Sequence, residues 1–190
     1  IDRVLVSTDD EEIASIAKAA GAEVPFLRPA EISGDFATDI EFMIHATNWC
    51  DENWHSTPNA WVHLRPTYPL RKVDDLERAC VDFSIGDCDS LRSVVPCEHS
   101  SYKTYNVDGD SLVPIFPVLG DIKEPFNMPR QILPSTYQHN GCIDIVATHV
   151  IKSGSMSGTK IRAFVMSHEE THDLDTIEQW NRVSSPTAKP

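Results

Sequence analysis

Three Asp-x-Asp pairs are the clearest candidates in this sequence for holding a metal ion: Asp87/Asp89, Asp108/Asp110 and Asp173/Asp175. Residues i and i+2 of an extended segment point to the same side, so each pair can present two carboxylates together. Mg²⁺ is typically held by one or two carboxylates together with substrate phosphates. The second pair is better explained by the Gly109 turn between its members, and the first lies in a polar loop. The pair near the C-terminus is therefore the most promising.

Asp173 and Asp175 follow a predicted strand, Ile161 to Met166, and precede a predicted helix that starts at Ile177. In open α/β sheets, ligands bind just beyond the carboxyl ends of the strands, which is where this pair is expected. The alternative is that the pair caps the helix after Thr176. The spacing leaves both roles open.

A second candidate site is the loop that ends at Arg71. A short apolar run from Trp61 to Leu64 leads into a loop with two prolines and two arginines, Arg65 and Arg71. Short apolar runs are typical of parallel strands that are covered on both faces. A stiff loop that carries cations at the end of such a strand suits an anionic ligand. The alternative is an ordinary strand that ends at Pro66, with both arginines in solvent.

The segment His168 to His172 matches the H-E-x-x-H motif of zinc proteases. In those enzymes the motif lies on a helix, so that both imidazoles face one metal ion. Here a predicted strand precedes it and Asp173-Leu174-Asp175 follows at once, so an ordinary polar loop is favoured. No G-x-G-x-x-G or Walker A phosphate loop occurs in the chain, and no serine lies in a nucleophile elbow.

Charge and cysteine content limit the possible partners. The formal net charge is −13 over 190 residues, which disfavours nucleic acid as a partner. A nucleotide ligand would need local cations and a divalent metal to overcome this field. The five cysteines form no C-x-x-C pair, which predicts reduced thiols and a cytoplasmic protein. No apolar segment approaches the ~20 residues that span a bilayer, so no membrane partner is expected.

The elements that position these residues alternate between strand and helix. Strands are expected at residues 3–6, 23–26, 61–64 and 90–95. Helices are expected after Thr8 and after Thr38, each followed three residues later by a glutamate as in a capping box, and over residues 73–83. Ile13 and Ile16 begin the apolar stripe of the first helix. Such alternation predicts an α/β fold with a mostly parallel sheet.

The pattern changes in the second half. Residues 102–116 read as a hairpin that turns at Asp108-Gly109, and residues 117–137 are irregular and rich in proline. Strands at 141–147 and 161–166 return to the core, and a short helix starts at Ile177. We expect one domain over residues 1–183 and a tail at 184–190. Within that domain, residues 102–138 form an excursion of the kind that packs on a partner subunit.

Taken in order, the motifs resemble those of the acylneuraminate cytidylyltransferase (CMP-sialic acid synthetase) family. The matching segments are residues 6–10, Leu27 to Glu31, Leu64 to Arg71, Arg130-Gln131, Asn140-Gly141 and Met166 to Thr176. They cover residues 1 to about 180. The resemblance implies a three-layer, Rossmann-like fold of the nucleotide-diphospho-sugar transferase type, with a small dimerisation excursion that contains the hairpin. It also implies transfer of CMP from CTP to a nonulosonic, sialic-acid-like sugar, with release of pyrophosphate.

The resemblance also assigns roles to individual residues. Asp173 and Asp175 match the Mg²⁺ carboxylates, and Asp175 would help to deprotonate the sugar hydroxyl. The nucleotide-binding positions are Arg28, Ala37 and Asp39. The sugar-binding positions are Arg65, Lys103, Arg130, Gln131 and Asn140, with Lys103 and Arg130 on the sugar carboxylate. In the family the segment that matches 102–138 reaches across a homodimer, so these two cations would serve the neighbouring subunit.

Departures from the family pattern bear on the sugar. Arg65 stands where the family usually has Gln, Tyr68 where it has a small hydroxyl residue, and Asp144 where it often has Tyr. Met156 and Ser157 replace an aromatic pair associated with the N-acyl group. The family's opening strand, phosphate loop and helix have no counterpart here, so we expect the natural protein to be longer. A non-catalytic dimeric module that binds nucleotide or sugar is the alternative.

Overall fold

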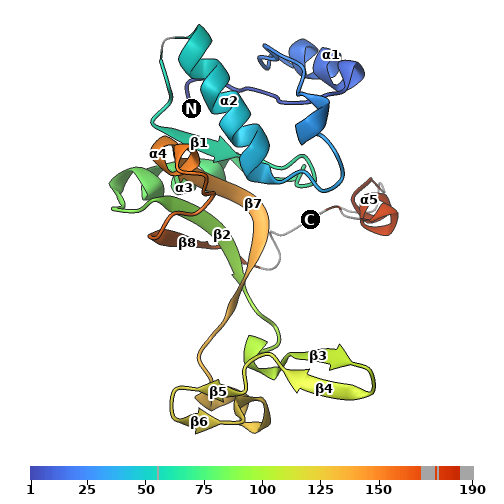
Figure 1. Ribbon diagram of the computed structural model, residues 1–190, viewed down its shortest axis with the longest axis vertical. Coiled ribbons are helices and arrows are strands. Elements are labelled where there is room, and N and C mark those ends of the chain that lie inside the picture. The colour runs from blue at the N-terminus through green and yellow to red at the C-terminus, as the bar shows by residue number, and fades with distance from the viewer. Residues whose placement is uncertain (55, 168–173, 175, 185–190) are drawn as a thin grey trace. The chain divides into compact units, whose positions relative to one another are not determined.

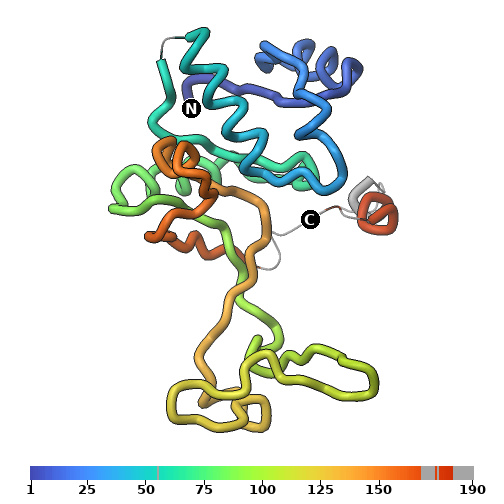
Figure 2. Tube along the Cα trace, in the orientation of Figure 1, coloured from blue at the N-terminus to red at the C-terminus, as the bar shows by residue number. Residues whose placement is uncertain are grey.

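The computed structural model describes residues 1–54, 56–167, 174 and 176–184 (Figures 1 and 2). The helices are α1 (Glu11–Ala19), α2 (Asp39–Asn53), α3 (Val73–Ile85), α4 (Thr148–Lys152) and α5 (Ile177–Ser184). The strands of the main sheet are β1 (Ala60–His63), β2 (Ser90–Pro96), β7 (Tyr137–Ala147) and β8 (Ile161–Val165). Two small hairpins pair β3 (Tyr105–Asp108) with β4 (Ser111–Pro114) and β5 (Val118–Leu119) with β6 (Ile122–Lys123). Short 3₁₀ turns occupy Ala30–Ile32, Ser101–Lys103, Pro125–Asn127 and Arg130–Ile132.

The main sheet has the strand order β1-β7-β2-β8. β8 runs parallel to β2, because the Asp89 amide bonds to Lys160 O at one end and the Met166 amide to Val94 O at the other. β7 runs antiparallel to β2, with bonds from the Ala147 amide to Asp89 O and from the Cys97 amide to Thr136 O. β1 lies on the other side of β7, where the Thr148 amide donates to Asn59 O. Only β7 opposes the other strands, which confirms the predicted α/β class with a mostly parallel sheet.

The chain divides into two compact units. The first comprises Ile1–Val62, Asp87–Ser90 and Ile145–Ile161, and the second comprises His63–Gly86, Leu91–Asp144 and Arg162–Pro190. Buried side chains of the first unit include Met43, Ala46, Cys50, Val150 and Ile151. Those of the second include Tyr68, Ala79, Leu91, Ile143 and Phe164. The single domain over residues 1–183 stays a prediction.

The two predicted capping boxes have different outcomes. At α2 the prediction is confirmed, because Glu41 Oε2 accepts hydrogen bonds from the Thr38 amide (2.6 Å) and the Thr38 hydroxyl (2.8 Å). At α1 the N-cap is Asp10, not Thr8. The Asp10 carboxylate accepts from the Ile13 amide at 2.8 Å, while the Thr8 hydroxyl accepts from the Asp10 amide. Aspartate is at least as good an N-cap as threonine, so the nearer residue takes that position.

The predicted strands at 3–6 and 23–26 are wrong. They form a single parallel bridge, between Leu5 and Glu23, and Val4 is 59% exposed. Ile13 and Ile16, predicted to be the buried stripe of α1, are also exposed. β-branched residues show that a segment suits a strand, but a ladder grows only where neighbouring strands pair along its length. Among the described residues, this segment has one such neighbour.

The predicted hairpin is present, and its turn lies one residue later than expected. Asp108 pairs with Ser111, so the two-residue loop is Gly109-Asp110. Gly109 has φ +57°, a conformation that glycine adopts without steric cost. The following segment, predicted to be irregular, also contains the β5–β6 hairpin. β7 starts at Tyr137, four residues earlier than expected, because its first part pairs with the end of β2.

No helix among the described residues is long and apolar enough to cross a membrane.

Candidate functional site

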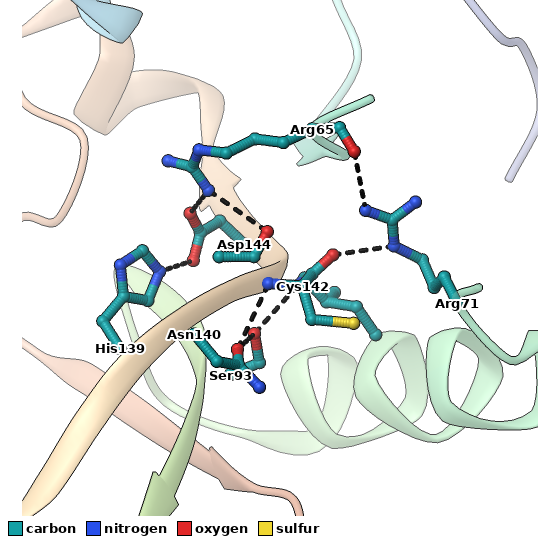
Figure 3. Close-up of polar contacts among 9 residues, drawn as sticks. Arg65, Arg71, Ser93, His139, Asn140, Cys142 and Asp144 are labelled. Carbon is teal, nitrogen blue, oxygen red and sulfur yellow. Dashed lines mark hydrogen bonds and ion pairs between the residues drawn. The ribbon is translucent and has the colours of Figure 1, made fainter. Parts of the chain in front are cut away.

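The arginine-containing loop is held against β7 by Arg71 (Figure 3). Arg71 Nε donates to Cys142 O at 2.7 Å, and its Nη2 donates to Arg65 O at 3.1 Å. Within the loop, the Tyr68 amide donates to Arg65 O and the Tyr68 side chain is buried. The Arg71 guanidinium lies 5.7 Å from the Tyr68 ring. One predicted cation is therefore a structural clamp that fixes the backbone of the other.

Arg65 pairs with Asp144, which lies on β7. Arg65 Nη1 lies 2.8 Å from Asp144 Oδ2, and His139 Nε2 lies 2.8 Å from Oδ1 of the same carboxylate. The Asp144 side chain is 1% exposed, whereas 26% of Arg65 and 34% of His139 is exposed. Figure 3 shows Asp144 between its two partners. The two departures from the family pattern, at Arg65 and Asp144, are thus partners of each other.

The surroundings of Asp144 favour its ionised form. Burial alone raises the pKa of this carboxyl group, but hydrogen bonds and charge from His139 and Arg65 outweigh burial and lower the pKa to about 2. The nearby Cys142 thiol is affected in the opposite direction, because burial raises its pKa despite the proximity of Arg71. Cys142 is therefore a protonated, packed thiol and not a nucleophile.

Asn140 and Ser93 shape the strand next to this pair. Asn140 Oδ1 accepts from the Ser93 hydroxyl at 2.6 Å and from the Cys142 amide at 3.2 Å, while Ser93 Oγ accepts from the Ile143 amide at 2.8 Å. Gly141 has φ +69°, and Arg65 Nη1 also approaches its carbonyl oxygen at 3.4 Å. The carboxamide oxygen of Asn140, which the resemblance assigns to the sugar, thus bonds to this local backbone and to Ser93.

The loop also contacts Leu174 near the C-terminus. The Leu174 amide donates to Thr67 O at 2.9 Å. Leu174 lies between Asp173 and Asp175 in the sequence, but these two residues lie outside the described part of the chain, as does the H-E-x-x-H segment from His168 to His172. Among the described residues, no group of three or more His, Cys, Asp and Glu side chains is arranged to hold a metal ion.

The predicted nucleotide-binding residues lie in the first unit. Arg28 Nε donates to Ser7 Oγ at 3.2 Å, its Nη2 donates to Ser7 O, and its amide donates to Thr8 O. These bonds join two of the family-like motifs, residues 6–10 and 27–31. The Arg28 guanidinium also lies 4.9 Å from the ring of Phe42 on α2.

Ala37 and Asp39 lie at the start of that same helix. The Ala37 amide donates to Gly34 O at 2.8 Å, and Asp39 is the first residue of α2. Phe42 follows Asp39 by about one helical turn, so the contact between Arg28 and Phe42 links the arginine to the first turn of α2. The structure thus connects Arg28 with the helix that Ala37 and Asp39 introduce.

The remaining predicted sugar-binding residues lie on the excursion. Lys103 Nζ donates to Phe126 O at 3.0 Å, and Arg130 and Gln131 open an exposed 3₁₀ turn. Arg130 lines a pocket of about 110 Å³ together with the buried Ser100, whose hydroxyl has no partner among the described residues. The other lining residues are Pro96, Cys97, Leu133, Pro134, Ser135 and Thr136.

The first Asp-x-Asp pair has a structural role. Asp89 Oδ2 accepts hydrogen bonds from the amides of Thr159 and Lys160 at 2.7 and 2.9 Å, and Asp87 pairs with Lys160 Nζ. The bonds from Lys160 and Thr159 lower the pKa of Asp89 to about 2. These carboxylates hold the turn that leads into β8.

Sequence reasoning missed His139 and Ser93. His139 lies in no motif and at no informative spacing, and Ser93 is one serine among many. Ser93 acts through Asn140, which lies 47 residues later in the chain, and His139 acts through Asp144, five residues later on the same strand. Neither contact is visible in a local sequence pattern. The sequence held one hint of this cluster: Arg65 and Asp144 both differ from the residues that the family usually has at these positions.

Known proteins resemble this chain in sequence. A scan against models of protein families finds no match. The chain is 28% identical to post-translational flagellin modification protein B of Campylobacter coli, over 91% of this chain and 72% of that protein. It is 27% identical to the CMP-N,N'-diacetyllegionaminic acid synthase of Campylobacter jejuni, with the same coverage. Identity to the N-acylneuraminate cytidylyltransferase of Escherichia coli is 26%, over 92% of this chain and 39% of that protein.

The fold of this chain is also similar to that of a solved structure. A solved structure of CMP:2-keto-3-deoxy-manno-octonic acid synthetase in complex with CTP superposes with a TM-score of 0.63, at 14% identity, over 96% of this chain and 79% of that one. At such low identity, the likeness establishes the nucleotidyltransferase fold. Together with the sequence relatives it confirms the resemblance that the motifs predicted. In sequence and in fold the chain is thus similar to cytidylyltransferases, among them an acylneuraminate cytidylyltransferase.

Proposed function

We propose that this chain transfers CMP from CTP to a nonulosonic, sialic-acid-like sugar and releases pyrophosphate. The observation that carries the proposal is the similarity, over more than nine-tenths of the chain, to enzymes named for joining CMP to acids of this class. The contact between Arg28 and the helix at Ala37 and Asp39 supports a nucleotide site in the first unit. The loop around Arg65 supports an acidic-sugar site in the second.

The proposed reaction exchanges one phosphorus–oxygen bond for another. The oxygen of the sugar's anomeric hydroxyl bonds to the α-phosphorus of CTP, and the bond from that phosphorus to the oxygen of the leaving pyrophosphate breaks. The hydroxyl proton passes to a base, a role that the resemblance gives to Asp175. Catalysis of such a transfer depends mainly on positioning and on the neutralisation of charge.

The metal in this proposal is Mg²⁺, held by Asp173 and Asp175. The donor set fits, because hard carboxylate oxygens together with phosphate oxygens are what Mg²⁺ prefers. The hydrogen bond from the Leu174 amide to Thr67 O supports the proposal, because Leu174 lies between the two aspartates in the sequence and Thr67 belongs to the loop of Arg65 and Arg71. When bound, the ion would supply charge neutralisation at the phosphates.

The chain is also proposed to act as a homodimer through the excursion at 102–138. Val107 and Leu112 are directly opposed across the β3–β4 hairpin, and Val107 is 75% and Leu112 65% exposed. Apolar faces of this kind commonly mark protein–protein contacts. We place the reaction in the cytoplasm, in keeping with five free cysteines.

Pyrophosphate release tests the proposal directly. The protein is incubated with CTP, Mg²⁺ and a panel of nonulosonic acids, with UTP and ATP as controls for the nucleotide. We expect release with CTP and at least one acid, and its loss in Asp173→Ala and Asp175→Ala while both variants stay folded. Binding of CTP or sugar without release from any combination would favour the non-catalytic module. Full activity in either variant would indicate that the pair caps the helix after Thr176 and does not hold the metal ion.

A further inference from the structure

The pocket beside Arg130 also contains a free thiol. Cys97 and Ser100, which follow the end of β2, form one side of this pocket of about 110 Å³. Arg130 and the segment that leads into β7 form the other side. The Cys97 amide donates to Thr136 O at 2.8 Å, which joins the two sides. All of these residues belong to the second unit, so the pocket is built within one compact part of the chain.

Two polar groups of the pocket have no partner in the described part of the chain. Ser100 is 8% exposed, and its hydroxyl oxygen is buried without a hydrogen bond to any described residue. Buried hydroxyl groups are normally hydrogen-bonded, so this one indicates a place for a ligand atom. Arg130 is exposed, and its guanidinium forms no ion pair with a described residue. The thiol thus shares its pocket with an unsatisfied hydroxyl and a cation.

We propose that Cys97 is a modification site that reacts with small acidic disulfides, which Arg130 and Ser100 receive. In this thiol–disulfide exchange, the Cys97 sulfur loses its proton to solvent and bonds to one sulfur of the disulfide. The original bond between the two disulfide sulfurs breaks. The other half leaves with the bonding electrons and takes up a proton. Cys97 is thereby oxidised, the leaving half is reduced, and the disulfide is the oxidant.

The lining of the pocket favours an acidic reagent. A guanidinium is a planar fork of donors that matches a carboxylate. The chain as a whole carries a formal charge of −13, so a small anion is attracted only where a local cation overcomes this field. Size also limits the ligand. Because a cavity of ~150 Å³ holds benzene, a pocket of about 110 Å³ holds roughly four or five non-hydrogen atoms, the size of a mercaptoacetate group.

The other four cysteines differ from Cys97 in ways that make them internal controls. Cys50 and Cys142 are fully buried, and burial raises the pKa of both thiols, to about 11 for Cys50. Such thiols are poor nucleophiles. Cys80 and Cys88 are half-buried, as Cys97 is, but do not line this pocket. Any preference for Cys97 over these two therefore reports the pocket and not exposure alone.

Modification would also affect the proposed function. The resemblance assigns Arg130 to the sugar carboxylate, and an adduct on Cys97 would occupy the space beside this arginine. This consequence rests on the proposed function. The adduct should raise KM for the sugar acid and leave KM for CTP unchanged. A reducing thiol should reverse the change, and Cys97→Ser should be insensitive to the disulfide.

Comparison of an acidic disulfide with its neutral twin tests the proposal. The reduced protein is incubated with dithiodiglycolate or with its uncharged diamide, and peptide mapping by mass spectrometry measures the rate of adduct formation at each cysteine. The acid-to-amide rate ratio at Cys97 is divided by the same ratio at Cys80 and Cys88, which removes the intrinsic difference between the reagents. The variants are Arg130→Gln and Ser100→Ala. Lys123→Gln, which removes the same charge from an exposed position on β6, is the matched control.

In the wild type, dithiodiglycolate is expected to modify Cys97 at least tenfold faster than Cys80 or Cys88. Arg130→Gln should abolish the preference for the acid at Cys97, because it removes the cation that attracts the carboxylate. Ser100→Ala should slow the reaction of Cys97 with both reagents. Lys123→Gln should match the wild type within twofold, and circular dichroism verifies that each variant is folded.

Equal rates at Cys80, Cys88 and Cys97 would overturn the inference, as would an acid preference at Cys97 that survives Arg130→Gln. Selective modification of Cys97 in a protein that releases no pyrophosphate would contradict the proposed function and leave the inference standing. Pyrophosphate release without selective modification would do the reverse.

Discussion

The bend in β7, residues 139–144 around Gly141, and the β3–β4 hairpin belong to the same unit. Polar side chains at the bend have partners within the chain, whereas apolar side chains of the hairpin are exposed. Around the bend, a buried carboxylate, an asparagine and two arginines are satisfied by one another and by the backbone. The hairpin is a two-stranded ribbon whose opposed Val107 and Leu112 are exposed. A lone hairpin of this kind is marginally stable in water. The first region therefore finds its polar partners within the chain, whereas the second leaves an apolar face exposed that the proposed homodimer would cover.

The largest expected effect comes from removing the charge at the centre of the first region. Asp144→Ala leaves Arg65 and His139 without their shared carboxylate and opens a buried space on β7. Breaking a buried ion pair at one partner costs about 3 kcal/mol of unfolding free energy. Urea unfolding followed by circular dichroism measures this, with Asp82→Ala at the exposed pair with Arg162 as the control. A loss no greater than in the control would mean that the bend does not depend on this charge.

A second prediction concerns acid. Because the pKa of Asp144 is lowered to about 2 in the folded chain, its ionised form stabilises the fold at pH values above its ordinary pKa. That contribution, about 2 kcal/mol, is lost as the pH falls from about 4 through 2. Asp144→Asn should therefore flatten the stability curve between these values, measured as the urea midpoint against pH. Asp89, whose pKa is also low, and Glu23, Glu41 and Asp51, whose pKa values are lowered, contribute acid sensitivity in both proteins.

A substitution in the β3–β4 hairpin is expected to have the smallest effect on folding stability. Its main effect is expected on dimer formation. Leu112→Asp places a charge on an exposed position, so the unfolding free energy of the monomer should change by no more than about 0.5 kcal/mol. If a second copy covers this face, the same change should convert a dimer to a monomer in light-scattering measurements. Asp110→Asn, in the adjoining turn, is the control. A dimer that survives Leu112→Asp would place the interface elsewhere.

Sequence reasoning succeeded where a local pattern corresponds to a local structure. The capping box at Thr38 and the hairpin near Gly109 depend on neighbours within a few residues. The apolar runs at β1, β2 and β8 were also recognised as strands, although their pairing partners lie far away in the sequence. It failed at the N-terminal segment, because β propensity cannot show whether a second strand will pair there. The roles of Asp173 and Asp175 remain predictions, since both lie outside the described residues.

The candidate site shows the same difference between local patterns, which the sequence reveals, and long-range contacts, which it does not. The order and spacing of motifs were sufficient to indicate the family and the α/β class, because both are carried by short segments that fold locally. Whether Arg65 would face solvent, a ligand or a counter-ion depended on Asp144, which lies 79 residues later in the chain. Only the antiparallel course of β7 brings that carboxylate, together with His139, to the loop. Pairing across such a separation is a property of the folded sheet, and no local pattern encodes it.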